Sequence, residues 1–278
     1  VELAAADGEI RLNITDDGGA HGTDTATVAV TAQSGGASPW SRTFGSSGHD
    51  FPYGVAVDAS GNVVVTGQVG GQTDFGNGPT CVGGNAFVAK YSSAGALLWS
   101  RCLGGSTGGG VGRSIAVDAS GAIVVVGSFG GTVDFGGGAV TAGWGATDIF
   151  VAKYSPSGAH VWSRRFGSAG NYTDEAATAV AVDAFGNVVL TGTIAAPVDF
   201  GGGPLNTGLF VVKLASDGRH VWSRGAVATP GGVAVDPSGN VVLTGSFYAC
   251  VDFGAGTLTG VATTVFVMAS ITETGFEA

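Results

Sequence analysis

A segment of about 60 residues recurs four times along the chain, and this repeat constrains the fold more than any other feature. Each copy contains the triplet Trp-Ser-Arg, a Val-Asp-x-x-Gly element and the triplet Asp-Phe-Gly. The tryptophans of the first element are Trp40, Trp99, Trp162 and Trp222, the aspartates of the second are Asp58, Asp118, Asp183 and Asp236, and the phenylalanines of the third are Phe75, Phe135, Phe200 and Phe253. A repeat of this length is one supersecondary unit that buries its apolar faces by stacking on its neighbours.

Each repeat has the pattern of four short strands. In the first copy, residues 55–57 and 63–66 are β-branched runs joined by a turn-forming segment, and residues 87–91 and 97–102 form a second hairpin. A loop with Asp-Phe-Gly lies between the two hairpins. No segment combines helix caps with a sustained 3.6-residue period, so we predict no helix. Four antiparallel strands per repeat are typical of a β-propeller blade, which predicts an all-β propeller of four blades.

The combined pattern W-S-R-x-F-G, A-V-D-x-x-G-N-V-V-V-T-G, D-F-G, F-V-A-K-Y and G-x-x-x-W-S-R resembles the bacterial SBBP-type β-propeller repeat. The resemblance covers roughly residues 38–270. It implies a propeller and an exported protein, outside or on the surface of a Gram-negative bacterium such as a myxobacterium. It implies no defined activity.

Residues 1–36 lie outside the repeat. Residues 9–15 and 25–31 alternate in polarity as strands do, and they resemble the last two strands of a PKD-like or other Ig-like extracellular module. Two strands do not fold alone as a sandwich. We therefore divide the chain into the end of such a module, residues 1–36, and a propeller, residues 37–278. The chain begins at Val1 without a signal-peptide pattern, so we expect a processed or truncated form.

Composition excludes several classes of function. Charged residues make up only 12% of the chain and the net charge is −10, whereas nucleic-acid binding requires a basic surface. No stretch approaches the ~20 apolar residues of a membrane-spanning helix. Hydrophobic residues make up 44%, which is enough for a core, and the 52 glycines favour many tight turns.

The three cysteines are Cys81, Cys102 and Cys250, and none of them belongs to a Cys-x-x-Cys pair. This spacing argues against a zinc ribbon and against a thioredoxin-like site. Cys81 and Cys102 flank the second predicted hairpin of the first repeat. They are therefore a candidate disulfide, if the Cβ geometry permits one.

The motifs that carry catalytic chemistry elsewhere lack their context here. Ser106 lies in a Gly-x-Ser-x-Gly segment, but the nucleophile elbow requires a strand-to-helix turn in a parallel sheet. We interpret that segment as a connection between blades. Four histidines are present, of which His160 and His220 occupy equivalent repeat positions, and none has metal-ligand spacing. The sequence therefore predicts a protein that is not an enzyme.

Binding residues are few. Trp144 is the only tryptophan outside the repeated triplets and lies in a glycine-rich loop, so it is a candidate ligand-binding residue. Clustered carboxylates make Asp16, Asp17 and Asp24 weak candidates for calcium, and no other cofactor is expected. The Val-Asp-x-x-Gly aspartates are predicted to bond the amides of their own turns, with calcium as the alternative.

The repeated aromatic residues have two interpretations. The phenylalanines of Asp-Phe-Gly and the Trp-Ser-Arg residues are predicted to pack the blades, because large rings supply buried area. For the tryptophans and arginines a ligand role remains the alternative, since these residue types dominate binding hot spots.

The leading functional prediction is a non-catalytic extracellular or cell-surface propeller acting in adhesion, scaffolding or surface structure, with a protein or a surface glycan as partner. The alternatives are a carbohydrate-binding propeller and a hydrolase or lyase that acts on polysaccharides, because a fold alone does not fix function.

Ring closure is the last prediction. The fourth repeat lacks a Trp-Ser-Arg strand, whereas Trp40 begins such a strand before the first repeat. Closing the ring would remove an exposed strand edge. We therefore expect the strand around Trp40 to pair with residues 265–268 of the same chain or, alternatively, with those of a second copy by strand exchange.

Overall fold

The structure is a computed structural model of the chain. It describes residues 2–3, 10–11, 25–30, 40–81, 84–105, 107–143, 146–168, 173–247, 250–252, 257–259 and 265–271. Before residue 40 and from residue 247 onward, the structure describes only the course of the backbone. All regular secondary structure in these residues is β-strand, so the prediction of an all-β chain without helices is confirmed for the part of the chain described.

Three antiparallel sheets of four strands correspond to the first three repeats. The first sheet consists of β5 (Phe51–Val57), β6 (Val63–Val69), β9 (Asn85–Tyr91) and β10 (Leu97–Leu103). The second consists of β11 (Gly109–Val117), β12 (Ile123–Gly130), β15 (Thr147–Tyr154) and β16 (His160–Phe166). The third consists of β17 (Ala176–Val182), β18 (Val188–Ile194), β21 (Gly208–Leu214) and β22 (His220–Ala226).

The fourth sheet has three described strands, β23 (Ala228–Val235), β24 (Val241–Phe247) and β27 (Val265–Ile271). Four small hairpins carry the Asp-Phe-Gly region of each repeat: β7 (Thr73–Asp74) with β8 (Pro79–Cys81), β13 (Thr132–Asp134) with β14 (Ala139–Thr141), β19 (Val198–Asp199) with β20 (Pro204–Leu205), and β25 (Cys250–Asp252) with β26 (Thr257–Thr259). The N-terminal strands are β1 (Glu2–Leu3), β2 (Ile10–Arg11), β3 (Thr25–Val30) and β4 (Trp40–Gly45).

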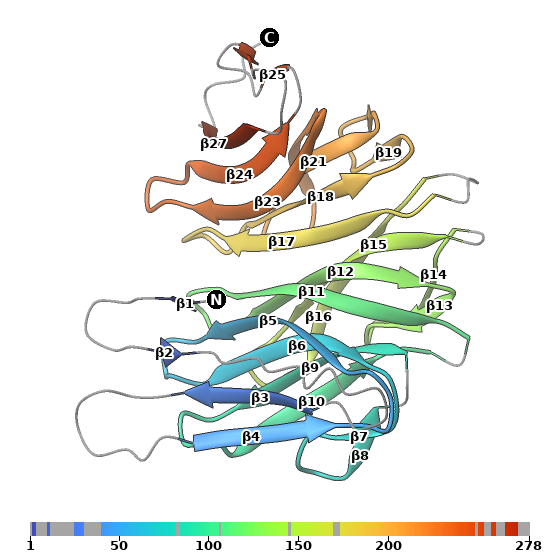
Figure 1. Ribbon diagram of the computed structural model, residues 1–278, viewed down its shortest axis with the longest axis vertical. Helices are drawn as coiled ribbons and strands as arrows, with labels where there is room; N and C mark the ends of the chain where they lie inside the picture. The colour runs from blue at the N-terminus through green and yellow to red at the C-terminus, as the bar shows by residue number, and fades with distance from the viewer. Residues whose placement is uncertain are drawn as a thin grey trace.

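Successive sheets pack on one another along the long axis of the molecule (Figure 1). The first strand of each repeat lies beside the first strand of the next, in the order β5, β11, β17, β23. We call these four strands the inner strands. No described strand of the fourth sheet hydrogen-bonds to the first sheet, so the described sheets form an open series and not a closed ring.

The hydrophobic core lies between the sheets. The second strand of each of the first three repeats is buried on both faces, as its unbroken β-branched run requires. In β6, Val64 packs in one cluster with Ile115 and Ile123 of the second sheet, whereas Val63 and Val65 pack with Phe44 of β4. The same arrangement recurs between the second and third sheets and between the third and fourth sheets.

The Asp-Phe-Gly triplets, predicted to be loops, form short hairpins. Asp74 Oδ1 accepts hydrogen bonds from the backbone amides of Gly76 and Gly78, at 2.7 and 2.9 Å, and Asp134 and Asp199 do the same in their own repeats. The ring of Phe75 packs on Phe87 with centroids 4.8 Å apart, and the later repeats have equivalent pairs. These phenylalanines are buried packing residues, apart from Phe253, which lies outside the described residues.

The predicted closure by the strand around Trp40 is wrong. β4 pairs antiparallel with β3, with Val30 opposite Trp40, and not with β27. The physical reason is that β4 packs on the first sheet in the same way as the fourth strands of the first and second sheets pack on the sheets that follow them. The indole Nε1 of Trp40 donates to the carbonyl of Ser93, and Arg42 Nε donates to the carbonyl of Gly95. The hydrogen-bonded β3–β4 pair also crosses the domain boundary expected after residue 36.

The fourth repeat differs from the others in register. In the first three sheets a glycine of the second strand lies opposite a phenylalanine, as Gly67 lies opposite Phe87. In the fourth sheet Gly245 lies opposite Val267, and Ser270 takes the place that Lys90 holds in the first sheet. Phe266 therefore does not occupy the place of Phe87 in the first sheet; Val267, one residue later, does.

Candidate binding site

The repeated Trp-Ser-Arg triplets join neighbouring sheets. Trp99 Nε1 donates to the carbonyl of Pro156 at 3.0 Å, and Arg101 Nε donates to the carbonyl of Gly158, in the last hairpin turn of the second sheet. Trp162 and Arg164 bond the corresponding turn of the third sheet in the same way. A Cβ added at Gly158 would lie 2.7 Å from the Trp99 ring, and the glycine has a φ of 84°. The tryptophan thus requires a glycine in the turn beneath it.

The aspartates of the Val-Asp-x-x-Gly elements close their own turns. Asp58 Oδ1 accepts from the amides of Ser60 and Asn62, both at 2.9 Å, and Asp118, Asp183 and Asp236 make corresponding bonds. Asp58 Oδ2 also pairs with Lys90 Nζ at 2.9 Å, and both side chains are buried. Equivalent buried pairs join Lys153 to Asp118 and Lys213 to Asp183.

These ion pairs set the protonation of the turn aspartates. Burial acts to raise the pKa of Asp58, but the hydrogen bonds from Lys90 and Asn62 outweigh it and lower that pKa to about 2. The pKa values of Asp118 and Asp183 are lowered by the same balance. Their carboxylates are therefore charged at neutral pH and engaged by the turn and the lysine.

Cys81 and Cys102 are joined by a disulfide between β8 and β10 in the structure. Among the described residues no group of three or more histidines, cysteines or acids is placed to hold a metal ion. The candidate ligand residue Trp144, the calcium candidates Asp16, Asp17 and Asp24, and Ser106 lie outside the described residues. In the part of the chain that is described, no helix is both long and apolar enough to cross a membrane.

Every inner strand contains a β-bulge at the same place. In β5 the pairing with β6 shifts between Pro52 and Gly54, so that Tyr53 is the extra residue. The extra residue is Arg113 in β11 and Thr178 in β17, and in β23 the shift spans residues 231–232. A bulge redirects the side chain that it carries and is common beside functional sites. The bulge thus carries a different residue in each of the first three sheets.

An aromatic row begins at the first of these bulges. The rings of His49, Phe51 and Tyr53 are stacked in sequence, with centroids 6.2 and 6.1 Å apart and planes within about 25°. The three side chains are exposed, at 40% for Phe51 and 44% for Tyr53. Three stacked and exposed rings at the start of one strand are unusual for residues that only fill a core.

Arg113 continues the row onto the second sheet. Its guanidinium carbon lies 5.8 Å from the centroid of the Tyr53 ring, within the range of a cation–π contact. Its Nε atom is buried without a hydrogen-bond partner, and no carboxylate in the described part of the chain forms an ion pair with it. We call His49, Phe51, Tyr53 and Arg113 the inner row.

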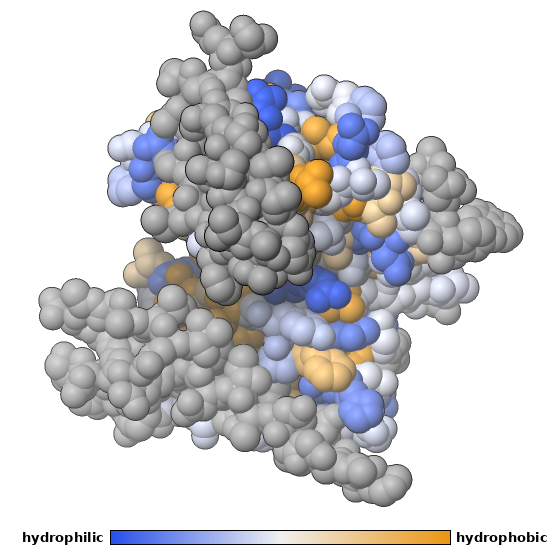
Figure 2. Space-filling model, turned by 45° about the horizontal axis from the view of Figure 1, so that its top comes forward, coloured by the Kyte–Doolittle hydropathy of each residue, from blue (hydrophilic) through white to orange (hydrophobic). Residues whose placement is uncertain are grey.

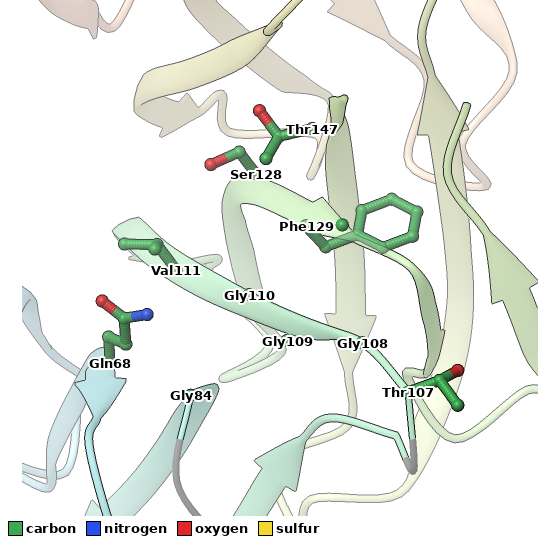
Figure 3. A pocket seen from close by; sticks show the side chains of 11 residues that line it. Gln68, Gly84, Thr107, Gly108, Gly109, Gly110, Val111, Ser128, Phe129 and Thr147 are labelled. Atoms are coloured by element: carbon green, nitrogen blue, oxygen red, sulfur yellow. The ribbon is translucent and has the colours of Figure 1, made fainter. Parts of the chain in front are cut away.

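A hollow of about 320 Å³, within the range of small-ligand pockets, is lined by residues of the first and second sheets. Its wall contains the glycine run Gly108–Gly110, with Gln68 and Val111 at one end and Thr107 at the other (Figure 3). Gln68 is the register partner of Phe51 in the first sheet. The remaining polar lining side chains are the hydroxyls of Ser128 and Thr147.

The second sheet lacks the buried acid that the first and third sheets carry near this end. In the first sheet Asp50 receives bonds from the amides of Ser46 and Gly70, at 2.5 and 2.9 Å, and in the third sheet Glu175 holds the corresponding place. In the second repeat glycines occupy the positions of this acid and of the serine that binds it, at Gly110 and Gly105. Gly110 lines the hollow, so the second sheet has backbone where the first and third sheets have a buried acid.

Glu175 is the one described acid with a raised pKa. Complete burial raises the pKa of its carboxyl, and the nearby charge of Asp148 adds to this, while hydrogen bonds from Thr173 and Ser168 oppose it. Its Oε2 atom has no hydrogen-bond partner. Because Asp50 holds the equivalent place in the first sheet, we interpret Glu175 as a structural acid of the repeat and not as a reactive one.

The visible face of the molecule carries hydrophobic and hydrophilic side chains in small alternating patches, without one broad apolar surface (Figure 2). Sequence reasoning did not find the inner row. One signal was nevertheless present: Tyr53, Arg113 and Thr178 each precede the repeated aspartate of their copy by the same number of residues, and the residue at this position differs from copy to copy.

Comparison with known proteins adds no family. No protein-family model and no curated protein matches the chain. Among solved structures, the chain is similar to an ulvan lyase of polysaccharide lyase family 25, with 11% identity, a TM-score of 0.43, and coverage of 94% of this chain and 75% of that one. It is also similar to BamB from Moraxella catarrhalis, with 12% identity, a TM-score of 0.36 and coverage of 97% and 87%.

A gluconolactonase from Xanthomonas campestris has 18% identity and a TM-score of 0.38, over 77% of this chain and 62% of that one. A protein of unknown function from Bacteroides caccae is also similar, at 10% identity and a TM-score of 0.42. The chain spans about three fifths of the length of these last two structures. All four likenesses are too distant to assign an activity to this chain.

Proposed function

We propose that the four sheets are blades of a β-propeller and that the protein is a non-catalytic binding module of the cell surface or extracellular space, acting in adhesion or scaffolding. Two observations support the propeller: the inner strands lie side by side, and the tryptophan and arginine of the first three Trp-Ser-Arg triplets bond the last hairpin turn of the sheet that follows. The open edge of β27 then receives a further strand of the Trp-Ser-Arg type, from another blade or another copy. The resemblance to the SBBP-type repeat supports an exported location.

One observation carries the binding function. The residues common to the repeats bond within or between sheets, whereas the bulges of β5, β11 and β17 present a side chain that differs from copy to copy. A scaffold that recurs around a variable position is the usual arrangement of binding repeats. The proposed partner is a surface glycan or a protein.

The test is the binding of the fluorescently labelled protein to intact bacterial cells and to their extracted extracellular matrix, measured by flow cytometry and by a plate assay. We expect saturable binding without turnover of the bound polymer, with and without a chelator. The proposal fails if no surface or matrix binds the protein saturably, or if the polymer is cleaved by the purified protein.

A further inference from the structure

We propose that the inner row binds an acidic polysaccharide, with a uronate carboxylate on Arg113 and sugar rings stacked on Tyr53 and Phe51. This inference rests on the proposed binding function and names its ligand class and its residues. It depends on three features of the described residues: the exposed stacked rings, the guanidinium without an acid partner, and the hollow lined by hydroxyl and amide groups.

The rings provide the first part of the recognition. Tyr53 and Phe51 are both exposed and nearly parallel, with planes inclined by 23°. A sugar ring has an apolar face of C–H groups that packs on an aromatic face, and burying apolar surface is favourable. Two successive rings of this kind on one strand suit successive residues of an extended chain better than a single small molecule.

Arg113 provides the charge. A buried guanidinium nitrogen without a partner is costly, and a carboxylate from a ligand would satisfy it with a charge-assisted hydrogen bond. Other arginines have partners within the protein. Arg42, Arg101 and Arg164 donate to turn carbonyls, and Arg165 and Arg219 pair with acids. Arg113 therefore favours an anionic ligand over a neutral one.

The hollow provides hydrogen bonds for sugar hydroxyls. Gln68 lies opposite Phe51 across β5 and β6, and Val111 is two residues from Arg113 on β11, so the hollow adjoins the inner row. The side chain of Ser128, which is 6% exposed, lines the hollow. Such a hydroxyl can donate to or accept from a sugar hydroxyl.

The net charge of the chain, −10, limits this recognition to short range. A polyanion is repelled by the protein as a whole, and moderate salt screens that repulsion beyond roughly 8–10 Å. Contacts at the inner row are closer than this and persist. Binding is therefore measured at physiological ionic strength.

The experiment is isothermal titration of the whole chain with a hexameric oligogalacturonate and with its methyl ester, which has the same sugar rings without the charges. We expect the acid form to bind more tightly than the ester. Arg113→Gln should weaken binding of the acid form about tenfold and abolish the difference between the two forms. Tyr53→Ala should weaken binding of both forms about tenfold.

Matched controls are Phe185→Ala, which removes an aromatic side chain that is 85% exposed on the third sheet, and Arg219→Gln, which removes an exposed arginine. Neither should change the affinity for either form. Thermal unfolding verifies that each variant folds, and Tyr53→Phe, which keeps the ring, should restore the affinity lost in Tyr53→Ala.

Failure of this inference is distinct from failure of the binding function. It is overturned if the wild-type protein binds neither form, if the ester binds as tightly as the acid, or if Tyr53→Ala and Arg113→Gln bind like the controls. If labelled protein still binds cells in any of these cases, the binding function stands and its ligand lies elsewhere. If both variants lose binding to cells as well as binding to oligogalacturonate, the inference is supported.

Discussion

The three lysines of the chain occupy one repeated position, and each pairs with the turn aspartate of its own sheet. The fourth repeat provides a natural comparison, because Ser270 stands where Lys90 stands in the first sheet. Asp236 therefore closes its turn without a lysine, through Asn240 and the backbone amides of the turn.

We expect Asp58→Asn to lower the free energy of unfolding by about 3 kcal/mol, because it leaves the Lys90 ammonium buried without its charge partner. Asp236→Asn keeps the turn acceptor and leaves no lysine unpaired, so the loss of stability should be clearly smaller than for Asp58→Asn. Urea unfolding at pH 7 measures both values. Adding Lys90→Met to Asp58→Asn should recover part of the loss, and equal losses at the two turns would contradict the ion-pair account.

The raised pKa of Glu175 predicts that the stability of the protein depends on pH. Its pKa is raised in the folded protein, so the wild-type protein is most stable where Glu175 is protonated, and this stability is lost as pH rises through the folded pKa. Glu175→Gln removes that loss and keeps an acceptor for Thr173. We therefore expect the variant to gain on the wild type as urea-unfolding measurements move from pH 4 to pH 8. A constant difference across this range would show that Glu175 does not titrate with folding.

At the scale of the elements, β4 behaves as the fourth strand of a preceding sheet. Its Phe44 is buried at 7% exposure and packs on Phe75 and Phe87 of the first sheet, with ring centroids 5.2 and 5.7 Å away. β3 pairs with β4 along its backbone, with Val30 opposite Trp40.

Deletion of residues 1–34 should therefore lower the thermal unfolding temperature of the protein by only a few degrees. Deletion of residues 1–44 removes Phe44 and the two bonds to the first sheet, and we expect a loss of about 3–5 kcal/mol, as for a large core truncation. Differential scanning calorimetry of the two truncated forms measures the contrast. If the two deletions are equally harmful, β4 does not act as a docked strand.

The sequence predicted the elements far better than their boundaries and partners. The β-branched run of residues 63–66 corresponds to β6, because a buried strand needs an apolar residue on both faces. The first strand was predicted only for residues 55–57, whereas β5 begins at Phe51, because proline, glycine and aromatic residues at a bulge conceal the alternation. The inner row was missed for the same reason.

Closure could not be predicted from strand counts. A surplus strand at one end and a missing strand at the other fit a ring, but they also fit an open series in which β4 docks on the first sheet. The choice depends on contacts that the repeat itself encodes: Trp40 and Arg42 fit the turn at Ser93 and Gly95 as Trp99 and Arg101 fit the next turn.

At the scale of the whole molecule, the fourth sheet ends at β27 without a described neighbour on its outer edge. Such an edge pairs readily with another strand. We expect a synthetic peptide with the sequence of residues 159–166, which contains Trp-Ser-Arg, to slow amide hydrogen exchange in β27. A peptide of scrambled sequence is the control. Unchanged exchange in β27 at saturating peptide would contradict the proposed addition of a strand.

The central claim is that repeated residues build the scaffold and that non-repeated residues of the inner strands bind the ligand. A library of all single substitutions, displayed on cells and sorted separately for protease resistance and for binding to the extracellular matrix, tests it most directly. We predict that substitutions at Trp99, Asp118 and Gly158 reduce protease resistance, whereas those at Tyr53 and Arg113 preserve resistance and abolish binding. Variants of Tyr53 and Arg113 that bind normally, or that lose binding only together with protease resistance, would contradict the account.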